Sequence, residues 1–315
     1  MTLLLLLVLV GLVALQWPHG SENPQQSARS KGWHLPDPMA GELFEDFSRV
    51  PDSGEAAARL IPPVSSSSPA APQPAPPAAH RQRAKHGGKS GGKSGGKSGH
   101  IALIIDDIGY DLVKERQLLA LPFPLTISVL PDATHSRRAA KLAHQAGRMV
   151  MLHLPMEPEN PRLRSHLDAS FLRLGMSIAR QQALFTQALS KVPFVQGVNN
   201  HMGSLLTANA ASMRGVMAVC RSHGLFFVDS RTSSRSVAAR EAKRAGLRWG
   251  ARRVFLDDKN DLVAIARSWR HAQRIAARHV DCIVIAHPRL HTVKFLQGLK
   301  KGDVALLRPL TALLH

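Results

Sequence analysis

The chain has 315 residues, a formal net charge of +19 at pH 7 and only two cysteines. Two cysteines are too few for a disulfide-stapled scaffold, so the core has to come from buried apolar side chains. A strongly basic chain favours anionic partners. Nucleic acid is disfavoured among them, because the chain has one tyrosine and does not interleave aromatic with basic residues. Acidic lipid headgroups and anionic cell-wall polymers remain as candidate partners.

The chain begins with an uncharged apolar stretch over residues 1–16. This stretch is too short to span a bilayer comfortably and has the length of the hydrophobic region of a signal peptide, although no Lys or Arg precedes it. A Pro- and Ser-rich tract follows it rather than a partner domain, which disfavours a buried helix. We therefore expect residues 1–16 to be a signal peptide or a membrane anchor. The protein would be exported to the periplasm or cell envelope, where a retained anchor would tether it to the membrane.

Residues 17–99 have the composition of a disordered linker. They contain SSSSPAAPQPAPPAA at 65–79 and the basic repeat GGKSGGKSGGKSG at 87–99, neither of which can build a packed core. The repeat matches the P-loop pattern G-x-x-x-x-G-K-S from Gly87 to Ser94. A P-loop needs a strand before it and a helix after it, whereas here a linker precedes and a strand follows. We therefore exclude a nucleotide site in the repeat.

From residue 100 onward, short apolar runs alternate with amphipathic stretches, a pattern typical of buried parallel strands separated by helices. The predicted strands lie near residues 101–105, 125–130, 148–152, 194–198, 225–228, 253–256 and 281–286, with an eighth near 303–307. The predicted helices lie near 111–120, 134–146, 177–190, 209–223, 235–245, 260–278 and 289–300, with Asn209 and Asn260 as N-caps.

Seven or eight such strands indicate an α/β fold, specifically a distorted or incomplete (β/α) barrel that occupies residues 100–315. An open, doubly wound sheet is the alternative. No Gly-x-Gly-x-x-Gly follows the first predicted strand, which argues against a dinucleotide site. Cys220 falls in a predicted helix and Cys282 begins a predicted strand, so we expect both to be unpaired, buried and apolar in character, although two cysteines of an exported protein could also pair.

Polar residues recur where the apolar runs stop. They are Asp106-Asp107, His153, the run Asn199-Asn200-His201, Asp229 and His287. The carboxyl ends of parallel strands lie on one side of a sheet or barrel, where α/β proteins keep their chemistry. Aspartate and histidine together are the ligand set of a catalytic zinc or a related divalent metal. The sequence therefore predicts a metal centre at the carboxyl ends of the strands.

We expect Asp107, His153 and His201 to hold a divalent metal, with zinc favoured. Asp106 is then expected to be the general base, because adjacent carboxylates can divide metal binding and proton transfer between them. His287 is expected to protonate a leaving amine or alkoxide from the other side of the cleft. The alternatives are a solvated Asp-Asp turn and histidines that merely pack in the core.

Four further polar residues belong to the predicted site. Asp229 is expected to assist catalysis by orienting a histidine or the base. Glu157, Asn200 and Arg231 are expected to contact substrate, and Glu157 could instead be a metal ligand or orient one. Asn200 and the adjacent Asn199 could either bind sugar hydroxyls or shape their turn. Arg231 could equally be a buried partner of Asp229.

Five segments together resemble the divergent polysaccharide deacetylase family, which is related to the NodB-type carbohydrate esterases. These segments are IIDDIG at 104–109, HLPMEP at 153–158, NNHMGS at 199–204, DSRT at 229–232 and IAHP at 285–288, spread in this order over about residues 100–310. The resemblance implies a distorted, NodB-like β/α barrel. It also implies Asp106 as the base, Asp107 and His153 as metal ligands, and His287 as the general acid.

The chain departs from the usual pattern of that family at two places. Glu157 stands where the second histidine of a His-x-x-x-His pair is usual, and the run around His201 replaces an Arg-Pro-Pro-Tyr segment. His201 would then supply the missing ligand. The sequence predicts a metal-dependent hydrolase that removes acetyl groups from a cell-envelope polysaccharide or glycan, including an anionic one. The alternative is a glycan-binding or scaffold protein, without catalysis, on a degenerate deacetylase fold.

Overall fold

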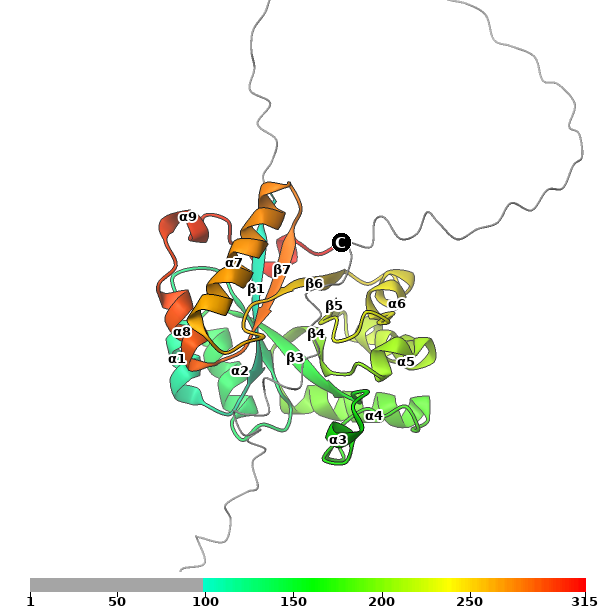
Figure 1. The fold of residues 1–315 in the computed structure, drawn as a ribbon. Coiled ribbons are helices and arrows are strands. Elements are labelled where there is room, and N and C mark those ends of the chain that lie inside the picture. The colour runs from blue at the N-terminus through cyan, green and yellow to red at the C-terminus, as the bar shows by residue number, and fades with distance from the viewer. Residues whose placement is uncertain (1–98) are drawn as a thin grey trace, which may run out of the picture. The chain divides into compact units, whose positions relative to one another are not determined.

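The computed structural model of the protein describes residues 99–315, in which seven parallel strands close into a barrel (Figure 1). The strands are β1 (Ile101–Ile108), β2 (Thr126–Val129), β3 (Met149–Met156), β4 (Val195–Met202), β5 (Phe226–Asp229), β6 (Trp249–Phe255) and β7 (Cys282–Ala286). They follow chain order around the barrel, and β7 pairs with β1 to complete the circle. The predicted barrel is confirmed; it is closed, and an open doubly wound sheet is excluded.

Helices form the layer outside the barrel, and at least one follows each strand (Figure 1). They are α1 (Leu112–Leu119), α2 (Ser136–Gln145), α3 (Pro161–Arg164), α4 (Ile178–Lys191), α5 (Ala210–Ser222), α6 (Ala238–Arg244), α7 (Leu262–Ala277), α8 (Leu290–Gln297) and α9 (Lys301–Val304), with 3₁₀ turns at Leu206–Ala208 and Leu310–Ala312. Within residues 99–315, no helix combines the length and apolar character that a membrane crossing requires. The predicted segment 1–16 and nearly all of the predicted linker 17–99 lie outside the described residues.

The predicted eighth strand at 303–307 is wrong. Residues 301–304 form α9, and Leu307 makes only an isolated bridge with Ile101 at the start of β1. The apolar run is present because the C-terminal segment packs against the amino ends of the strands. His315, the last residue, exchanges two main-chain hydrogen bonds with Trp249 at the start of β6.

The two predicted N-caps have different outcomes. Asn209 caps α5, and its side chain accepts a hydrogen bond from the main-chain nitrogen of Ser212. Asn260 is wrong as the cap of α7, because Asp261 takes that position and accepts from Val263 and Ala264. The short polar side chains of Asn260 and Asp261 are both good caps, so sequence alone does not choose between them. The two cysteines are unpaired and buried, as predicted.

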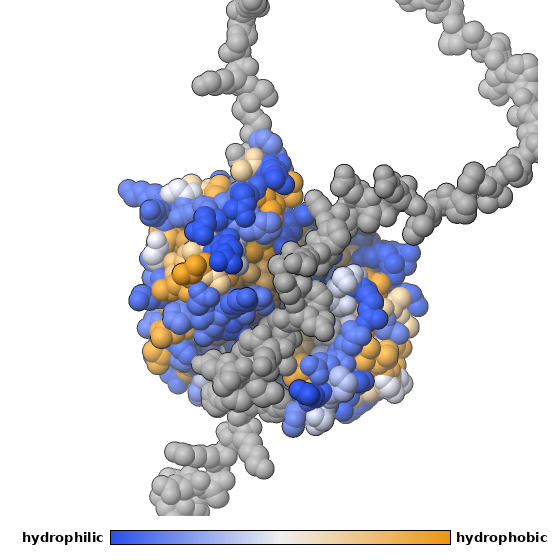
Figure 2. Space-filling view, viewed as in Figure 1, coloured by the Kyte–Doolittle hydropathy of each residue, from blue (hydrophilic) through white to orange (hydrophobic). Residues whose placement is uncertain are grey.

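Alternate residues of each strand face two separate cores. On β1, Leu103 and Ile105 join the large core between barrel and helices, whereas Ala102 and Ile104 join a smaller cluster that we place inside the barrel. The inner cluster also contains Met151, Phe226, Val228, Ile283, Ile285, Leu310 and Leu313. Because Leu310 and Leu313 fill the amino end, the carboxyl end is left for polar side chains. On the outer face of the domain that Figure 2 shows, hydrophilic residues are interspersed with hydrophobic ones.

Three strands extend further than their apolar runs predicted. β1 continues to Ile108, β3 to Met156 and β4 to Met202, instead of ending near residues 105, 152 and 198. The hydrophobic pattern stops earlier because the last inward-facing positions of these strands line a polar site. Several predicted site residues therefore lie within the barrel wall rather than in loops after it.

Candidate metal centre

The inward-facing positions become polar toward the carboxyl ends of the strands. Asp106 follows Ala102 and Ile104 on β1, His153 follows Met151 on β3, and His287 follows Ile283 and Ile285 of β7, each at a spacing of two. Asn199 of β4 is in register with His153 of β3. Period-two alternation therefore carries the inner apolar cluster into a polar layer at this end of the barrel.

Asp107 reaches the same layer through an irregularity in β1. In a regular strand it would face away from Asp106. The β1–β2 register shifts between Ile105 and Ile108, and Asp107 has a φ of 56°. A left-handed conformation is uncommon for a non-glycine residue and often marks a functional position. It allows both adjacent carboxylates to approach His153.

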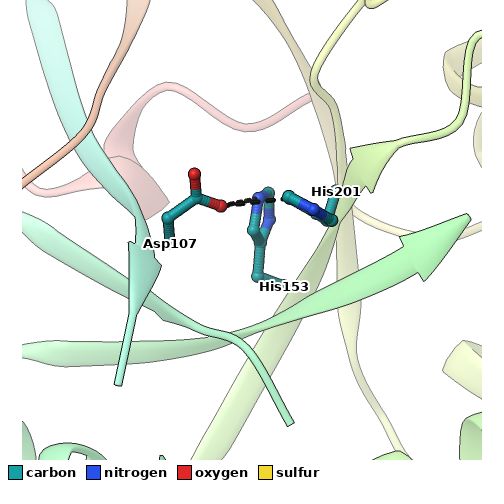
Figure 3. A group of neighbouring side chains, drawn as sticks. All are labelled: Asp107, His153 and His201. Carbon is teal, nitrogen blue, oxygen red and sulfur yellow. Dashed lines mark ion pairs between the residues drawn. The ribbon is translucent and has the colours of Figure 1, made fainter. Parts of the chain in front are cut away.

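Asp107, His153 and His201 form a group whose ligand atoms all lie within 4.8 Å of one another. Oδ1 of Asp107 is 3.0 Å from Nδ1 of His201 and 3.3 Å from Nε2 of His153. Figure 3 shows the three side chains pointing toward one another. One carboxylate and two imidazoles are the protein ligand set expected of a catalytic zinc or a related metal.

The chemistry of the group fits a cation. Oδ1 of Asp107 is buried and makes no hydrogen bond within the described residues, although two ring nitrogens approach it. A buried carboxylate oxygen without a hydrogen bond is costly unless a positive charge compensates it. Burial by itself raises the pKa of Asp107, but His201 and His153 outweigh burial and hold it well below its usual range. An ionised carboxylate between two imidazoles could therefore hold a divalent metal ion.

Asp106 lies beside this group and is itself buried. Its Oδ2 is 3.6 Å from Nε2 of His153, and both of its oxygens accept a hydrogen bond from Nδ2 of Asn199, at 2.9 and 3.0 Å. Burial raises the pKa of Asp106, and the attraction of His153 and the hydrogen bond from Asn199 offset only part of that effect. A carboxylate with a raised pKa is better matched to accepting a proton near neutral pH.

His287 approaches the group from β7, with Nε2 3.8 Å from Oδ2 of Asp107. Its other ring nitrogen, Nδ1, is 3.0 Å from Oδ1 of the fully buried Asp257. Asp257 also accepts from the main-chain nitrogen of His287 and from the hydroxyl of Thr292. Burial lowers the pKa of His287, but the charge and hydrogen bond of Asp257 overcome this and raise it. The histidine is thus oriented and its protonated form is favoured.

The model of the divergent polysaccharide deacetylase family matches residues 103–310. The chain belongs to this family. It is 38% identical over 197 residues to the uncharacterized protein YibQ of Escherichia coli K12, a match that covers 62% of this chain and 61% of YibQ. It is 36% identical over 198 residues to an uncharacterized protein of Haemophilus influenzae Rd, covering 63% of this chain and 70% of that protein. The matched part is thus less than two thirds of YibQ.

Among solved structures, the fold is similar to that of the uncharacterized protein ATU2773 from Agrobacterium tumefaciens C58. The TM-score is 0.64 at 20% identity, and the match covers 70% of this chain and 91% of that one. Identity this low supports the fold alone. Family membership and the Asp107, His153 and His201 group together give a deacetylase-family barrel with a group that could bind a metal.

Glu157 lies outside the group of ligand atoms. Its Oε2 accepts from the main-chain nitrogen of Leu174 at 2.7 Å, and its main-chain oxygen accepts from Leu205 and Leu206. Through Leu174 it ties down the segment that carries Phe171, whose ring lies edge-on 6.0 Å from that of His201. These contacts make Glu157 a support for the loop beside the ligands.

Asn200 faces away from the ligand group. Its amide donates to the main-chain oxygen of Met202 and accepts from the main-chain nitrogen of Ser230. It is 1% exposed, so the contacts favour the turn-shaping alternative over contact with a sugar. Its neighbour Asn199 is buried among the catalytic candidates instead, as expected from the alternation of a strand.

Within the described part of the chain, Asp229 makes no hydrogen bond to a histidine or to Asp106. Its carboxylate accepts from the main-chain nitrogen of Arg231 and the hydroxyl of Ser236, and burial raises its pKa. Arg231 has a φ of 47° and lies next to this carboxylate. The geometry therefore places Asp229 as an anchor of the loop after β5, and Arg231 on that loop.

Three residues of this site were not predicted from the sequence. They are Asn199 as a bridge between His153 and Asp106, Asp257 behind His287, and Arg252. The buried guanidinium of Arg252 donates to the main-chain oxygens of Ser230 and Arg231, and burial lowers its pKa to about 10. Asp257 follows the predicted strand 253–256, so the pattern that indicated Asp106 was present here too.

Proposed function

We propose that the protein is a metal-dependent hydrolase that removes acetyl groups from a cell-envelope polysaccharide. The observation that carries the proposal is the convergence of Asp107, His153 and His201 within 4.8 Å, with Asp106 beside the group and His287 facing it. Membership of the deacetylase family supports the same reaction class. Zinc is the metal we favour for one carboxylate and two imidazole ligands.

A divalent metal held by these three residues would lower the pKa of a water molecule and polarise the acetyl carbonyl. Asp106 accepts the proton of the attacking water, since it is the unliganded carboxylate of the pair and has a raised pKa. His287 donates a proton to the departing amine or alcohol, and Asp257 holds its ring in place for this step. The base and the acid are therefore separate residues on β1 and after β7.

The setting of the reaction is part of the proposal. The apolar residues 1–16 and the Pro-, Ser- and Gly-rich residues 17–99 suit an exported protein whose domain reaches away from a membrane. The net charge of +19 suits an anionic glycan. We therefore propose a periplasmic or cell-envelope location and an acetylated glycan of that compartment as substrate.

The test is the metal content of the purified full-length chain after incubation with zinc and dialysis, followed by acetate release from acetylated glycans. We expect about one ion per chain in the wild type and in His223→Ala, a control histidine on the exposed end of α5. Asp107→Ala and His201→Ala should lose the ion and the activity. A folded wild type that takes up no metal would overturn the hydrolase and favour a glycan-binding protein on the same fold.

A further inference from the structure

Asn199 is a fully buried amide that touches four polar side chains from different parts of the barrel. Oδ1 is 2.9 Å from Nδ1 of His153 and accepts from the hydroxyl of Ser128 at 2.6 Å. Nδ2 donates to Asp106 and, at 3.2 Å, to the hydroxyl of Ser230. An amide has two acceptor sites and two donors, so every hydrogen-bonding position of Asn199 is used.

The orientation of this amide follows from its neighbours. Reversing it would place the amide oxygen 2.9 to 3.0 Å from both oxygens of Asp106, which is repulsive for an ionised carboxylate. The oxygen of Asn199 therefore faces His153. Oxygen cannot donate, so the contact between Asn199 and His153 needs the proton on Nδ1 of the ring. Nε2 faces Asp107 at 3.3 Å, and it is the nitrogen left to bind a metal.

We propose that Asn199 is a positioning residue that prepares the metal centre: it fixes the tautomer of His153 so that Nε2 is free to bind a metal, and it holds Asp106 beside the same ligand. The proposal rests on the metal-dependent function above and names a residue that governs loading of that site. Histidine ligands commonly depend on a partner at the second nitrogen, and loss of such a partner weakens metal binding about 10- to 100-fold.

Packing alone does not account for the amide. A leucine of similar size would fill the same volume in this closed barrel without the cost of burying a polar group. Asn200, the next residue, is equally buried but bonds to the main chain of Met202 and Ser230 and to the hydroxyl of Thr232. The two asparagines therefore form a matched pair in which only Asn199 touches His153 and Asp106.

The experiment measures the protonation of His153 directly, by nitrogen-15 NMR of the imidazole in the zinc-loaded full-length chain. His153→Gln identifies the resonance. We expect the wild type to carry the proton on Nδ1. Asn199→Leu should shift the ring toward the Nε2 tautomer, while Asn200→Leu should leave the wild-type tautomer unchanged.

Zinc affinity, measured by chelator competition, gives the second readout. We expect Asn199→Leu to bind about 10- to 100-fold more weakly than the wild type, and Asn200→Leu to bind as tightly as the wild type. Nε2 protonation in the wild type, or equal zinc affinity in Asn199→Leu, would overturn the proposal. Wild-type protein that has the Nδ1 tautomer and binds zinc but releases no acetate would instead contradict the proposed function and leave the role of Asn199 standing.

Discussion

Nδ1 of His287 lies 3.0 Å from Oδ1 of Asp257, and the main-chain nitrogen of the same histidine donates to Oδ2 of that aspartate at 2.8 Å. The two contacts come from one carboxylate, which is fully buried. They fix both the position and the rotation of the imidazole ring. The free nitrogen, Nε2, is consequently directed toward Asp107, from which it is 3.8 Å away.

Asp257→Asn is expected to lower the proposed deacetylase activity roughly 100-fold, the usual scale for loss of a general acid–base contribution. The charge of Asp257 raises the pKa of His287 against the effect of burial. In its proposed role as general acid, His287 works only when protonated, so activity should fall as pH rises through this pKa. In the variant the pKa is lower, and the fall should occur at lower pH. Measuring kcat from pH 5 to 9 tests the shift, with Asp281→Asn, whose aspartate bonds His100 at the surface, as control.

A second prediction for Asp257 concerns the stability of the fold. The attraction of His287 outweighs burial and holds the pKa of Asp257 below its ordinary value. A carboxyl group whose pKa is lower in the folded than in the unfolded state stabilises the fold at pH values above its unfolded-state pKa, which is about 4. This stabilisation is lost as the pH falls through the folded-state pKa. Asp257→Asn should therefore lower the free energy of unfolding by about 2 kcal/mol at neutral pH. Urea titrations near pH 7 and pH 3 should show the difference shrinking at the lower pH.

The sequence was sufficient for the barrel and for selecting Asp107, His153 and His201 as candidates, because apolar runs and the polar residues at their ends are short-range patterns. Each strand was visible as an apolar run, and Asp107, His153 and His201 stood where such runs stopped. The end of an apolar run, however, does not mark the end of its strand. β4 runs on to Met202, so the alternation of inward and outward positions continues through Asn199, Asn200 and His201.

That continuation decides which residues enter the site. With β4 extended, Asn199 and His201 face inward together and Asn200 faces outward, but the register with β3 is a long-range property of the closed barrel. The position of Asp107 is a similar case. Adjacent Asp106 and Asp107 cannot both face one cleft in a regular strand, and the bulge that permits it depends on β2. Local sequence contains neither register nor bulge.

Glu157→Ala is expected to keep the metal and lose part of the support of the neighbouring loop. The carboxylate of Glu157 accepts from the main-chain nitrogen of Leu174 and is not in the group of ligand atoms. Metal content should stay at the wild-type value, whereas the free energy of unfolding should fall by about 1 to 2 kcal/mol through loss of a charged hydrogen bond. Glu157→Gln retains an acceptor and serves as the control. Loss of metal in both variants would make Glu157 a ligand and contradict this assignment.

The two cysteines should be inert toward thiol reagents in the folded protein. Burial raises the pKa of the Cys282 thiol to about 12 and raises that of Cys220 as well. Reaction requires the thiolate and access to it, and both side chains are fully buried. We expect no labelling of the native chain by a maleimide and labelling of two thiols per chain in denaturant. A reducing agent should leave the melting temperature unchanged, because no disulfide is present among the described residues.

Gly109→Ala should disturb the ligand group from outside it. Gly109 follows the bulge of β1 with a φ of 126°, and a Cβ there would lie 2.6 Å from Cβ of Ala133. Its nitrogen donates to the buried Glu115 at 2.7 Å, which ties the end of β1 to α1. An alanine is therefore both strained and obstructed. We expect a loss of about 3 kcal/mol in the free energy of unfolding, from strain and overpacking together.

Gly147→Ala is the matched control for that substitution. Gly147 has a φ of 68°, also in the left-handed region, but a Cβ there would meet nothing within 4 Å. Its cost should be about 1 kcal/mol, the strain of a left-handed alanine alone. Since Gly109 is two residues from Asp107, its substitution should also weaken zinc binding, whereas Gly147→Ala should not. Equal losses of stability in the two variants would show that the contact with Ala133 relaxes freely and that the end of β1 does not depend on it.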